Sequence, residues 1–261
     1  MLEDRICLVT GAGQGMGRPA AIEMARQGAA AVAVLDVKRD TGEETADLVR
    51  EAGAKSIFLE CDLRERGQIF AAVDSVVDAF GGLDVLHNNA GVLERAFTDD
   101  VDFDTVPEEL WDLVMDVNLK ATWLMSRAAA PHLRCSIRTP AIVNAASTAG
   151  YVAYSHAVYG VSKAAVIQLT KTMAVSMAPD VRVNCYCPGT IDTEMSTGVS
   201  SRGGSDPRVA NMVAENLIPR RGTVEEVAKL VCFLASPDAT FITGASYLID
   251  GGSLAWRGRR G

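Results

Sequence analysis

A tyrosine and a lysine spaced by one helical turn are the first residues of this chain that could do chemistry together. Tyr159 and Lys163 lie four positions apart in a segment with helical periodicity, so both side chains project from one face. A phenol with an ordinary pKa of about 10 is a poor base at neutral pH, but a nearby ammonium favours the phenolate and lowers that pKa. The pair therefore predicts a tyrosine that can exchange a proton with a substrate.

Two polar residues elsewhere in the chain support this interpretation. Ser147 follows the apolar run 141–146, and a strand there would bring its hydroxyl to the carboxyl edge of a sheet, within reach of the same substrate oxygen. The alternative is that Ser147 caps the local backbone. Asn118 lies in a long helical stretch although asparagine is a mediocre helix former, so it marks a functional position, a polar kink or a core hydrogen bond.

A glycine-rich turn near the start of the chain predicts a phosphate site. The stretch Thr10–Gly17 reads TGAGQGMG and follows the apolar run 6–9. Glycines there permit a tight turn and a close approach of the backbone and the next helix N-terminus to a pyrophosphate. Asp36 ends the following apolar strand, where its carboxylate can accept hydrogen bonds from both ribose hydroxyls and would repel a 2′-phosphate.

The residues around Asp36 favour NAD over NADP. Lys38 and Arg39 leave room for a 2′-phosphate and so for NADP. The other residues near this position offer a phosphate no charge: Ala12, Gln14 and Val37. We therefore expect NAD as the cofactor.

Alternating strands and helices predict the architecture that must position these groups. Apolar runs indicate strands at Ile6–Val9, Ala31–Leu35, Ser56–Glu60, Val85–His87, Ala141–Ala145, Arg182–Tyr186 and Ser246–Ile249. Helical periodicity indicates helices at Met16–Gln27, Thr41–Ala52, Arg66–Phe80, Glu108–Leu133, Ala157–Met177 and Val224–Ala235. This order predicts an α/β fold of the Rossmann type, a doubly wound parallel sheet of about seven strands with helices on both faces. We expect one domain over residues 1–261, with a substrate-loop insertion at about 190–221.

Composition narrows the function classes. The 261 residues are 48% hydrophobic and carry a net charge of -8, which argues against nucleic-acid or membrane-surface partners. Neither a basic leader nor a membrane-length apolar run is present, so we expect a cytoplasmic protein. The three histidines lack ligand spacing, which predicts no metal site. The six cysteines are interpreted as small buried hydrophobes, and strand alternation would place Cys185 and Cys187 on one face.

An ordered set of motifs resembles the classical branch of the short-chain dehydrogenase/reductase family over nearly the whole chain. The glycine turn has the spacing T-G-x-x-x-G-x-G. The further motifs follow in the family order: Asp62-Leu63, Asn88-Asn89-Ala90-Gly91, Asn118, Ser147, Tyr159-Gly160-Val161-Ser162-Lys163, Pro188-Gly189 and Asp250-Gly251-Gly252.

The resemblance implies roles for these residues. Tyr159 would take the hydroxyl proton of a secondary alcohol while hydride leaves for the nicotinamide, and it would donate a proton in the reverse direction. Ser147 would stabilise the developing charge, and Lys163 would also hold the nicotinamide ribose. Asn118 would hold a water that links Lys163 to solvent. The catalytic set is thus Asn118, Ser147, Tyr159 and Lys163.

The resemblance also implies the cofactor contacts and the assembly. Asp62 and Leu63 would lie beside the adenine. The backbone at Ile191 and the hydroxyl of Thr193 would bind the carboxamide of the nicotinamide. The full cofactor set is Gly11, Gln14, Gly15, Met16, Gly17, Asp36, Asp62, Leu63, Asn89, Ala90, Gly91, Tyr159, Lys163, Pro188, Gly189, Ile191 and Thr193. Family members commonly form homotetramers through the helices corresponding to Glu108–Leu133 and Ala157–Met177 and through the last strand.

Some features depart from the family pattern or remain open. Ser147 precedes Tyr159 by 12 positions, one fewer than the spacing typical of the family. The connection before Asn118 is long and carries the acidic run 99–104, which we expect to be a solvated loop or the border of the active-site mouth. Side chains that could line a substrate pocket are Tyr151, Tyr154, His156, Met195 and Met212.

Rival functions on the same fold fit the spacing less well. Enoyl reductases of this superfamily place a tyrosine seven positions before the lysine, where this chain has His156. Epimerases and dehydratases need a glycine where this chain has Gln14. An NADP-dependent carbonyl reductase and a non-catalytic nucleotide-binding regulator are the remaining alternatives. The sequence leaves the substrate open among sterols, terpenoid alcohols, polyols and hydroxyacyl thioesters.

Overall fold

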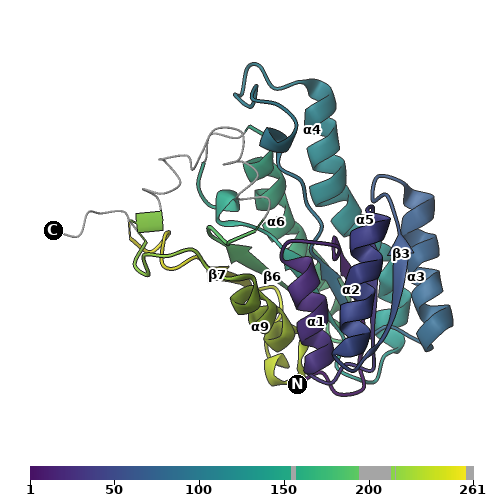
Figure 1. Ribbon diagram of the computed structural model, residues 1–261. Coiled ribbons are helices and arrows are strands. Elements are labelled where there is room, and N and C mark those ends of the chain that lie inside the picture. Colours follow the sequence, from purple (N-terminus) through teal and green to yellow (C-terminus); the bar gives the residue numbers. More distant parts are fainter. Residues whose placement is uncertain (154–156, 194–212, 215, 257–261) are drawn as a thin grey trace.

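A parallel sheet forms the centre of the molecule (Figure 1). The computed structural model describes residues 1–153, 157–193, 213–214 and 216–256. Within them, one seven-stranded sheet has the order β3-β2-β1-β4-β5-β6-β7, and each neighbouring pair is parallel. The strands are β1 (Ile6–Thr10), β2 (Ala31–Asp36), β3 (Lys55–Glu60), β4 (Val85–Asn88), β5 (Ala141–Ala145), β6 (Arg182–Pro188) and β7 (Ser246–Ile249).

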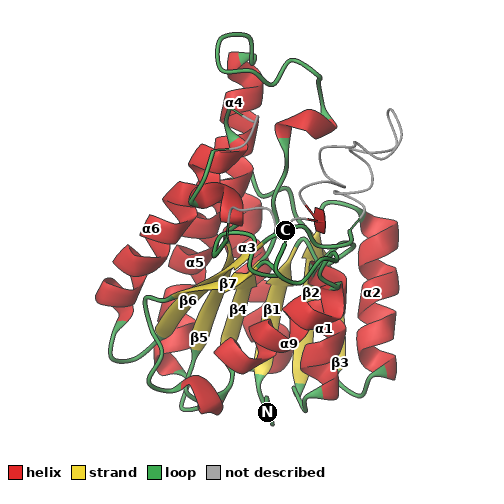
Figure 2. Ribbon diagram, turned by 90° about the vertical axis from the view of Figure 1, so that its left-hand side faces the viewer, coloured by secondary structure: helices red, strands yellow, loops and turns green. Residues whose placement is uncertain are grey.

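Helices cover both faces of this sheet, as Figure 2 shows. The helices are α1 (Gly17–Arg26), α2 (Arg39–Glu51), α3 (Arg66–Phe80), α4 (Glu108–Met115), α5 (Ala121–Cys135), α6 (Tyr159–Met177) and α9 (Val224–Ala235). Short 3-10 turns are η1 (Glu94–Ala96), η3 (Thr148–Gly150) and η4 (Pro237–Ala239). Helices α1, α2 and α9 pack on one face, and α3, α5 and α6 pack on the other. The doubly wound, single-domain fold predicted from the sequence is confirmed.

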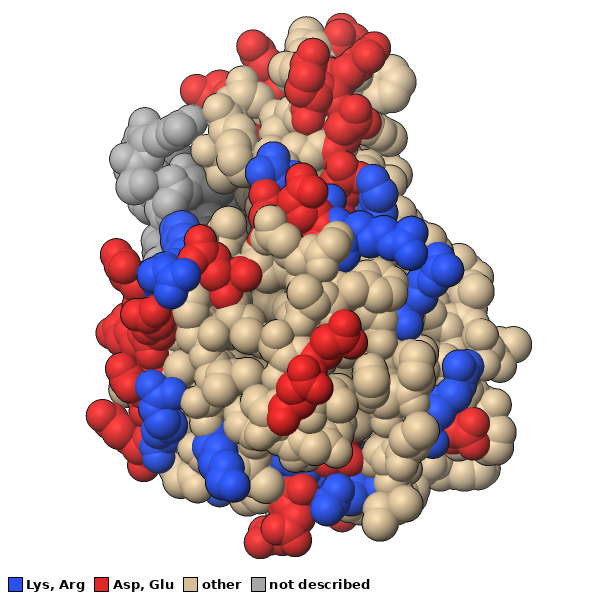
Figure 3. All heavy atoms as spheres, turned by 90° about the vertical axis from the view of Figure 1, so that its right-hand side faces the viewer, with Lys and Arg blue, Asp and Glu red and all other residues tan. Residues whose placement is uncertain are grey.

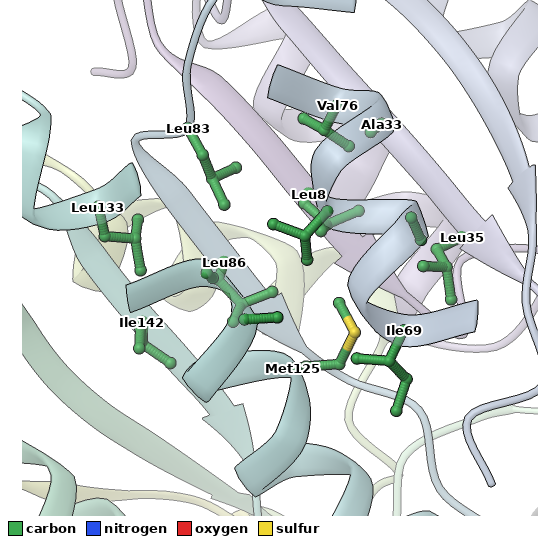
Figure 4. Close-up of a cluster of buried hydrophobic side chains, with 14 of the residues drawn as sticks. Leu8, Ala33, Leu35, Ile69, Val76, Leu83, Leu86, Met125, Leu133 and Ile142 are labelled. Carbon is green, nitrogen blue, oxygen red and sulfur yellow. The ribbon is translucent and has the colours of Figure 1, made fainter. Parts of the chain in front are cut away.

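Two hydrophobic clusters, one on each face, explain why the strands read as continuous apolar runs. Leu8 and Leu86, from β1 and β4, meet Ile69 of α3 and Met125 of α5 (Figure 4). Val9, the next residue of β1, belongs to the cluster on the opposite face. Because successive strand residues point to opposite faces and both faces are covered, every position of β1 is buried.

The predicted helix Glu108–Leu133 is interrupted, and this corrects the sequence interpretation. A π-helical turn, η2 (Asp116–Lys120), joins α4 to α5, so the α-helical hydrogen-bond pattern changes at the turn that contains Asn118. Single π turns within helices commonly occur at functional sites. The sequence signalled this turn only through an asparagine in a helical stretch.

The ends of β1 and β4 define where a ligand can bind. Strand β1 pairs with β2 on one side and with β4 on the other, so the chain order reverses there. In open α/β sheets, the crevice outside the carboxyl ends at such a reversal binds the ligand. The turns that follow Thr10, Asp36 and Asn88 all lie at this edge of the sheet.

The burial predicted for the six cysteines is confirmed for five of them. Five cysteines are buried, with Cys185 and Cys187 in one cluster as strand alternation predicts, but Cys135 is exposed at the end of α5. The interpretation of all six as buried hydrophobes was therefore wrong for Cys135, because the residue lies in the last turn of its helix.

Across the described residues, no helix combines the length and the apolar character that crossing a membrane would require.

The acidic run forms an exposed loop, as predicted. Asp99, Asp100, Asp102 and Asp104 are exposed, and Figure 3 shows acidic side chains gathered at the end of the molecule that carries α4. The carbonyl of Val101, within this run, accepts a 3.1 Å hydrogen bond from the backbone N–H of Ala157. The loop therefore lies against the segment that leads into α6.

Candidate active site

The glycine turn after β1 has the geometry that a phosphate site needs. Gly11 and Gly15 adopt positive φ angles of 61° and 58°. A Cβ on Gly17 would lie 2.3 Å from the carbonyl oxygen of Gly11. Within the described part of the chain, no side chain caps α1, whose N-cap residue is Met16. The turn therefore leaves backbone N–H groups at a helix N-terminus available to an anion.

The turn after β4 is fixed against this glycine turn. The Oγ1 atom of Thr10 accepts hydrogen bonds from the backbone N–H groups of Asn89 and Ala90, at 3.0 and 3.1 Å. The Nδ2 atom of Asn89 donates to the carbonyls of Thr10 and Gly11 at 3.0 and 3.1 Å. A Cβ on Gly11 would lie 2.8 Å from the Cα of Ala90. Asn89, Ala90 and Gly91 are thus held beside the predicted pyrophosphate site.

Asp36 stands at the end of β2 and faces the same turn. Its Oδ2 accepts the N–H of Gly13 at 2.8 Å, and its Oδ1 accepts the N–H of Lys38 at 3.0 Å. The Nζ of Lys38 donates to Oε1 of Gln14 at 3.1 Å. Each carboxylate oxygen has a second lone pair, so the carboxylate remains able to accept a ribose hydroxyl.

The structure gives Asp62 and Leu63 different surroundings. The carboxylate of Asp62 accepts hydrogen bonds from the side chain and the backbone N–H of Arg64, and these bonds lower the pKa of Asp62. Leu63 is half-buried and packs against the core cluster under β2. Both residues follow β3, the edge strand that is separated from β4 by β2 and β1, at the outer side of the predicted cofactor cleft.

Tyr159 and Lys163 lie together at the start of α6. The Nζ atom of Lys163 is 5.6 Å from the centre of the Tyr159 ring, so the two side chains share a face as their spacing predicts. Lys163 is 3% exposed, and its Nζ donates to the carbonyl of Ala145 at 2.8 Å. Burial lowers the pKa of Lys163 to about 8. An ammonium in such surroundings interacts strongly with a neighbouring phenol.

Asn118 contacts the segment after β4 and helix α6. Its Oδ1 accepts the N–H of Val92 at 2.8 Å, and its Nδ2 donates to the carbonyl of Val92 and to Oγ of Ser162, both at 3.0 Å. A Cβ on Gly91 would lie 3.2 Å from both Asn118 Oδ1 and Lys163 Nζ. The π turn therefore brings Asn118 next to Lys163, and its amide makes the core hydrogen bonds that were one sequence interpretation.

Ser147 makes the local contact that was the alternative interpretation of this residue. It ends the segment after β5 and is the N-cap of η3, where its Oγ accepts the N–H of Ala149 at 3.1 Å. Only 7% of Ser147 is exposed. The contact uses an oxygen lone pair and leaves the hydroxyl proton as a donor. Ser147 lies two positions after Ala145, whose carbonyl holds Lys163.

The turn after β6 borders a pocket. Gly189 donates its N–H to the carbonyl of Ile249, and Ile191 forms a bridge with Gly222. The pocket has a volume of about 290 Å³, and its lining includes Thr190, Ile191, Asn216, Ile218, Leu248 and Asp250. Pro188 accepts a 3.2 Å hydrogen bond from Oγ1 of Thr148. Thr193 ends the described part of this turn.

Of the five side chains predicted to line a substrate pocket, the structure describes Tyr151 alone. Tyr151 is 49% exposed, and the partial burial of its side chain raises the pKa of the phenol. The other four lie outside the described residues: Tyr154, His156, Met195 and Met212.

Sequence reasoning missed several residues that organise this site. Thr10 joins the two turns at the sheet edge, Ser162 joins Asn118 to α6, and the fully buried Glu94 contacts the start of α6. Thr10 and Ser162 lie inside quoted motifs but carry no pattern of their own. Glu94 had no sequence signal, because its contacts lie 64 and 65 positions further along the chain.

Comparison with known proteins places this geometry in a family. The family model described as enoyl-(acyl carrier protein) reductase matches residues 11–253. A 2-(R)-hydroxypropyl-CoM dehydrogenase of Xanthobacter autotrophicus is 37% identical over 256 residues, which cover 96% of this chain and 99% of that protein. A 3-oxoacyl-(acyl-carrier-protein) reductase of Thermotoga maritima is 36% identical over 260 residues, which cover 96% of this chain and 98% of that protein.

A solved structure gives the same result. A double mutant of a Serratia marcescens short-chain dehydrogenase/reductase superposes with a TM-score of 0.86 at 32% identity, over 97% of this chain and 98% of that chain. The fold matches this solved structure, and the sequence matches the two relatives, over nearly the full length of each chain. The chain belongs to the short-chain dehydrogenase/reductase family, whose members are oxidoreductases that use nicotinamide cofactors.

Proposed function

We propose that this protein is an NAD-dependent oxidoreductase that interconverts a secondary alcohol and a ketone, with Tyr159 as the general acid and base. The observation that carries the proposal is the buried Lys163 ammonium, 5.6 Å from the Tyr159 ring and next to the turn after β4. The cation stabilises the phenolate, so Tyr159 can accept a proton near neutral pH.

The residues at the sheet edge fit a dinucleotide. A Cβ on Gly11, Gly13 or Gly17 would lie 2.8, 2.7 or 2.3 Å from other protein atoms, so this turn holds its backbone closer to its surroundings than any side chain would allow. The N-terminus of α1 lies directly after the turn and favours a pyrophosphate. When bound, the nicotinamide supplies a hydride acceptor or donor.

The protein groups then have complementary tasks in alcohol oxidation. The hydroxyl proton of the substrate passes to the phenolate oxygen of Tyr159 as the hydride leaves the carbinol carbon. The hydroxyl of Ser147 donates to the substrate oxygen as its charge changes, and Lys163 holds the ribose and the tyrosine. Asn118 holds the turn that contains Gly91, which lies beside Lys163 in space. In this proposal, Asn118 also binds a water that carries the proton to solvent. Ketone reduction reverses each transfer.

The surroundings of Asp36 support NAD. Its carboxylate faces the glycine turn, where a 2′-phosphate would meet a like charge. Lys38 contacts Gln14, and Arg39 pairs with Glu43 and Glu60 at 3.1 and 2.6 Å. Arg39 is thus paired with two carboxylates, whereas Lys38 hydrogen-bonds to a neutral amide in the glycine turn. An NADP-dependent carbonyl reductase is the second candidate, and Lys38 is the cation that would bind its 2′-phosphate.

The substrate is proposed only as a class. The two named relatives act, by their names, on a hydroxypropyl-CoM and on a 3-oxoacyl chain, which share a carbinol or carbonyl carbon and little else. We propose that residues 190–221 form the loop that selects the substrate, because they follow β6 at the ligand-binding edge. Enoyl reduction, the activity in the family model's description, is disfavoured because His156 stands where enoyl reductases have their tyrosine.

We also propose a homotetramer. Trp123 of α5 and Val161 and Val175 of α6 are 44%, 47% and 84% exposed, so the outer faces of these helices carry large apolar side chains among their polar ones. Burial of such faces against a second copy is favourable. Light scattering at micromolar concentration tests this, and a strict monomer would refute it.

Replacement of the tyrosine oxygen tests the catalytic assignment. Tyr159→Phe should lower turnover of secondary alcohols with NAD by about 100- to 10,000-fold while leaving cofactor binding nearly intact, because only the proton-transferring oxygen is removed. Tyr247→Phe, in β7, is the matched control and should retain turnover. Retained turnover in Tyr159→Phe would overturn the assignment of Tyr159, and a wild-type protein that binds NAD without oxidising any secondary alcohol would favour the non-catalytic nucleotide-binding regulator.

A further inference from the structure

The N-terminus of α6 is held by a carboxylate from a distant segment. Oε1 of Glu94, in η1, accepts the backbone N–H of Val158 at 2.9 Å and that of Tyr159 at 3.2 Å. Val158 is the N-cap residue of α6 and has no polar side chain to satisfy these groups. Glu94 therefore replaces the N-cap side chain from 64 and 65 positions away in the chain.

The burial of this carboxylate requires a compensating interaction. Glu94 is 0% exposed, and its Oε2 has no hydrogen-bonding partner among the described residues. A buried carboxylate is costly unless hydrogen bonds and favourable charges surround it. The two N–H groups and the positive end of the α6 dipole supply both at Oε1. The contact thus fixes the backbone at the residue that carries the phenol.

The carbonyl side of Tyr159 is tied to the same segment. Oγ of Ser162 donates to the carbonyl of Tyr159 at 2.8 Å and accepts from Nδ2 of Asn118 at 3.0 Å. The Asn118 amide in turn makes two hydrogen bonds with Val92, two residues before Glu94. The backbone of Tyr159 is thus fixed at its N–H by Glu94 and at its carbonyl through Ser162 and Asn118, and both paths end in residues 92–94.

We propose that Glu94 is a positioning residue that fixes the backbone of Tyr159 and so sets where its phenol oxygen lies relative to the substrate. The inference rests on the proposed function, because it gives Glu94 a task only if Tyr159 transfers the proton. Glu94 touches neither substrate nor cofactor in this proposal. A displacement of about 1 Å at a reacting group can cost on the order of 100-fold in rate, so loss of this anchor should be measurable in kcat.

Three substitutions distinguish the effect of the length of the Glu94 side chain from the effect of its charge. Glu94→Asp keeps the charge but shortens the side chain by one methylene, so its oxygen no longer reaches Tyr159 N–H in the same position. Glu94→Gln keeps the length and an accepting oxygen but removes the charge. Glu94→Ala removes the acceptor. Glu109→Ala, an exposed acid in the first turn of α4, is the matched control.

The measurements are kcat, KM, the dissociation constant for NAD and the melting temperature of each variant. We expect kcat to fall about 10-fold in Glu94→Asp and about 10- to 100-fold in Glu94→Ala, while Glu94→Gln stays within about threefold of wild type. The dissociation constant for NAD should change less than about twofold in all of them. A role in stability alone would lower the melting temperature and leave kcat of the folded enzyme unchanged.

A double-mutant cycle shows whether the effect passes through the phenol. In the Tyr159→Phe background, Glu94→Asp should cause no further loss of the residual rate, because the group that it positions is absent. An unchanged kcat in both Glu94→Asp and Glu94→Ala, with Tyr159→Phe inactive, would overturn this inference alone. A loss in Glu94→Gln without a loss in Glu94→Asp would also overturn it, since charge rather than reach would then matter. An active Tyr159→Phe would overturn the proposed function and this inference together.

Discussion

The Nζ atom of Lys163 lies 5.6 Å from the centre of the Tyr159 ring and donates to the carbonyl of Ala145 at 2.8 Å. No carboxylate among the described residues forms an ion pair with this ammonium. A buried cation without a counter-charge costs stability, and burial accordingly lowers the pKa of Lys163 to about 8. Because no carboxylate neutralises this ammonium, its positive charge acts on the neighbouring ring of Tyr159.

The stability cost of Lys163 should appear as a pH dependence. Between pH 8 and 10.5, the unfolded chain holds this proton and the folded protein has released it, so the unfolded state binds more protons and stability rises with pH. We expect the free energy of unfolding of wild type minus that of Lys163→Met to be constant below pH 8 and to rise by up to about 3 kcal/mol by pH 10.5.

Urea unfolding at a series of pH values measures this difference. Lys171→Met, which removes an exposed lysine from the same helix, is the control and should give a nearly flat difference. A flat difference for Lys163→Met as well would contradict the lowered pKa of Lys163.

Gly91 should be needed for the position of Lys163. A Cβ there would lie 3.2 Å from both Lys163 Nζ and Asn118 Oδ1, and both atoms are held by other hydrogen bonds. We expect Gly91→Ala to fold and to lose about 10-fold in kcat, because the ammonium must move by a few tenths of an ångström. The assay is alcohol oxidation followed by the absorbance of reduced cofactor.

Gly67→Ala is the control for that substitution. Apart from its chain neighbours and the backbone of its own helix, no atom of the described residues lies within 4 Å of a Cβ at Gly67, which is exposed in the first turn of α3. This variant should keep its kcat and gain up to about 1 kcal/mol of stability, because alanine has the higher helix propensity. Equal kcat values for the two variants would refute the proposed constraint on Lys163.

His87 should make the protein sensitive to acid. The ring is fully buried and its Nε2 lies 3.2 Å from the hydroxyl of Tyr186, and burial lowers the pKa of His87 from 6.5 to about 3. Between these pH values the unfolded chain binds the proton and the folded protein does not, so stability is lost as pH falls. The loss attributable to His87 should approach about 5 kcal/mol near pH 3.

The variant His87→Phe keeps a ring of similar shape and cannot titrate. The free energy of unfolding of wild type minus that of His87→Phe, from urea midpoints between pH 7 and 4, should decline as pH falls. The half-buried His132 of α5 supplies the control His132→Asn, for which the corresponding difference should change little. If His87→Phe loses stability with acid as steeply as wild type, another group is responsible.

The parts of the site that follow local patterns could be predicted from the sequence, and the parts that depend on distant contacts could not. Spacing within one strand, turn or helix determines where the glycine turn, Asp36 and the pair Tyr159 and Lys163 lie. Glu94 is different, because a single glutamate reveals nothing about a helix that starts 65 positions later.

The interruption of the long helix was also beyond the sequence pattern. The apolar period continues from α4 into α5, so periodicity alone predicts one helix. The π turn at Asp116–Lys120 coincides with hydrogen bonds from Asn118 to Val92 and Ser162, which are tertiary contacts. Such contacts override local propensity, and only the folded arrangement reveals them.

Asp36 should control the choice between the two nicotinamide cofactors. Its carboxylate, 7% exposed, accepts the N–H of Gly13 in the glycine turn, so a 2′-phosphate on the ribose would approach a fixed negative charge. We expect Asp36→Ala to weaken NAD binding about 10- to 100-fold, because two charge-assisted hydrogen bonds to the ribose are lost. The ratio of kcat/KM for NADP to that for NAD should rise.

A second substitution should complete the reversal of preference. Val37 is 60% exposed directly after the acid, so Asp36→Ala combined with Val37→Arg adds a phosphate partner where the repulsion has been removed. We expect kcat/KM for NADP to rise by about 100-fold or more over wild type, and Asp40→Ala, an exposed acid at the start of α2, to change neither cofactor's value. A wild-type enzyme that already uses both cofactors equally well would show that the carboxylate of Asp36 turns away from the ribose when the dinucleotide binds.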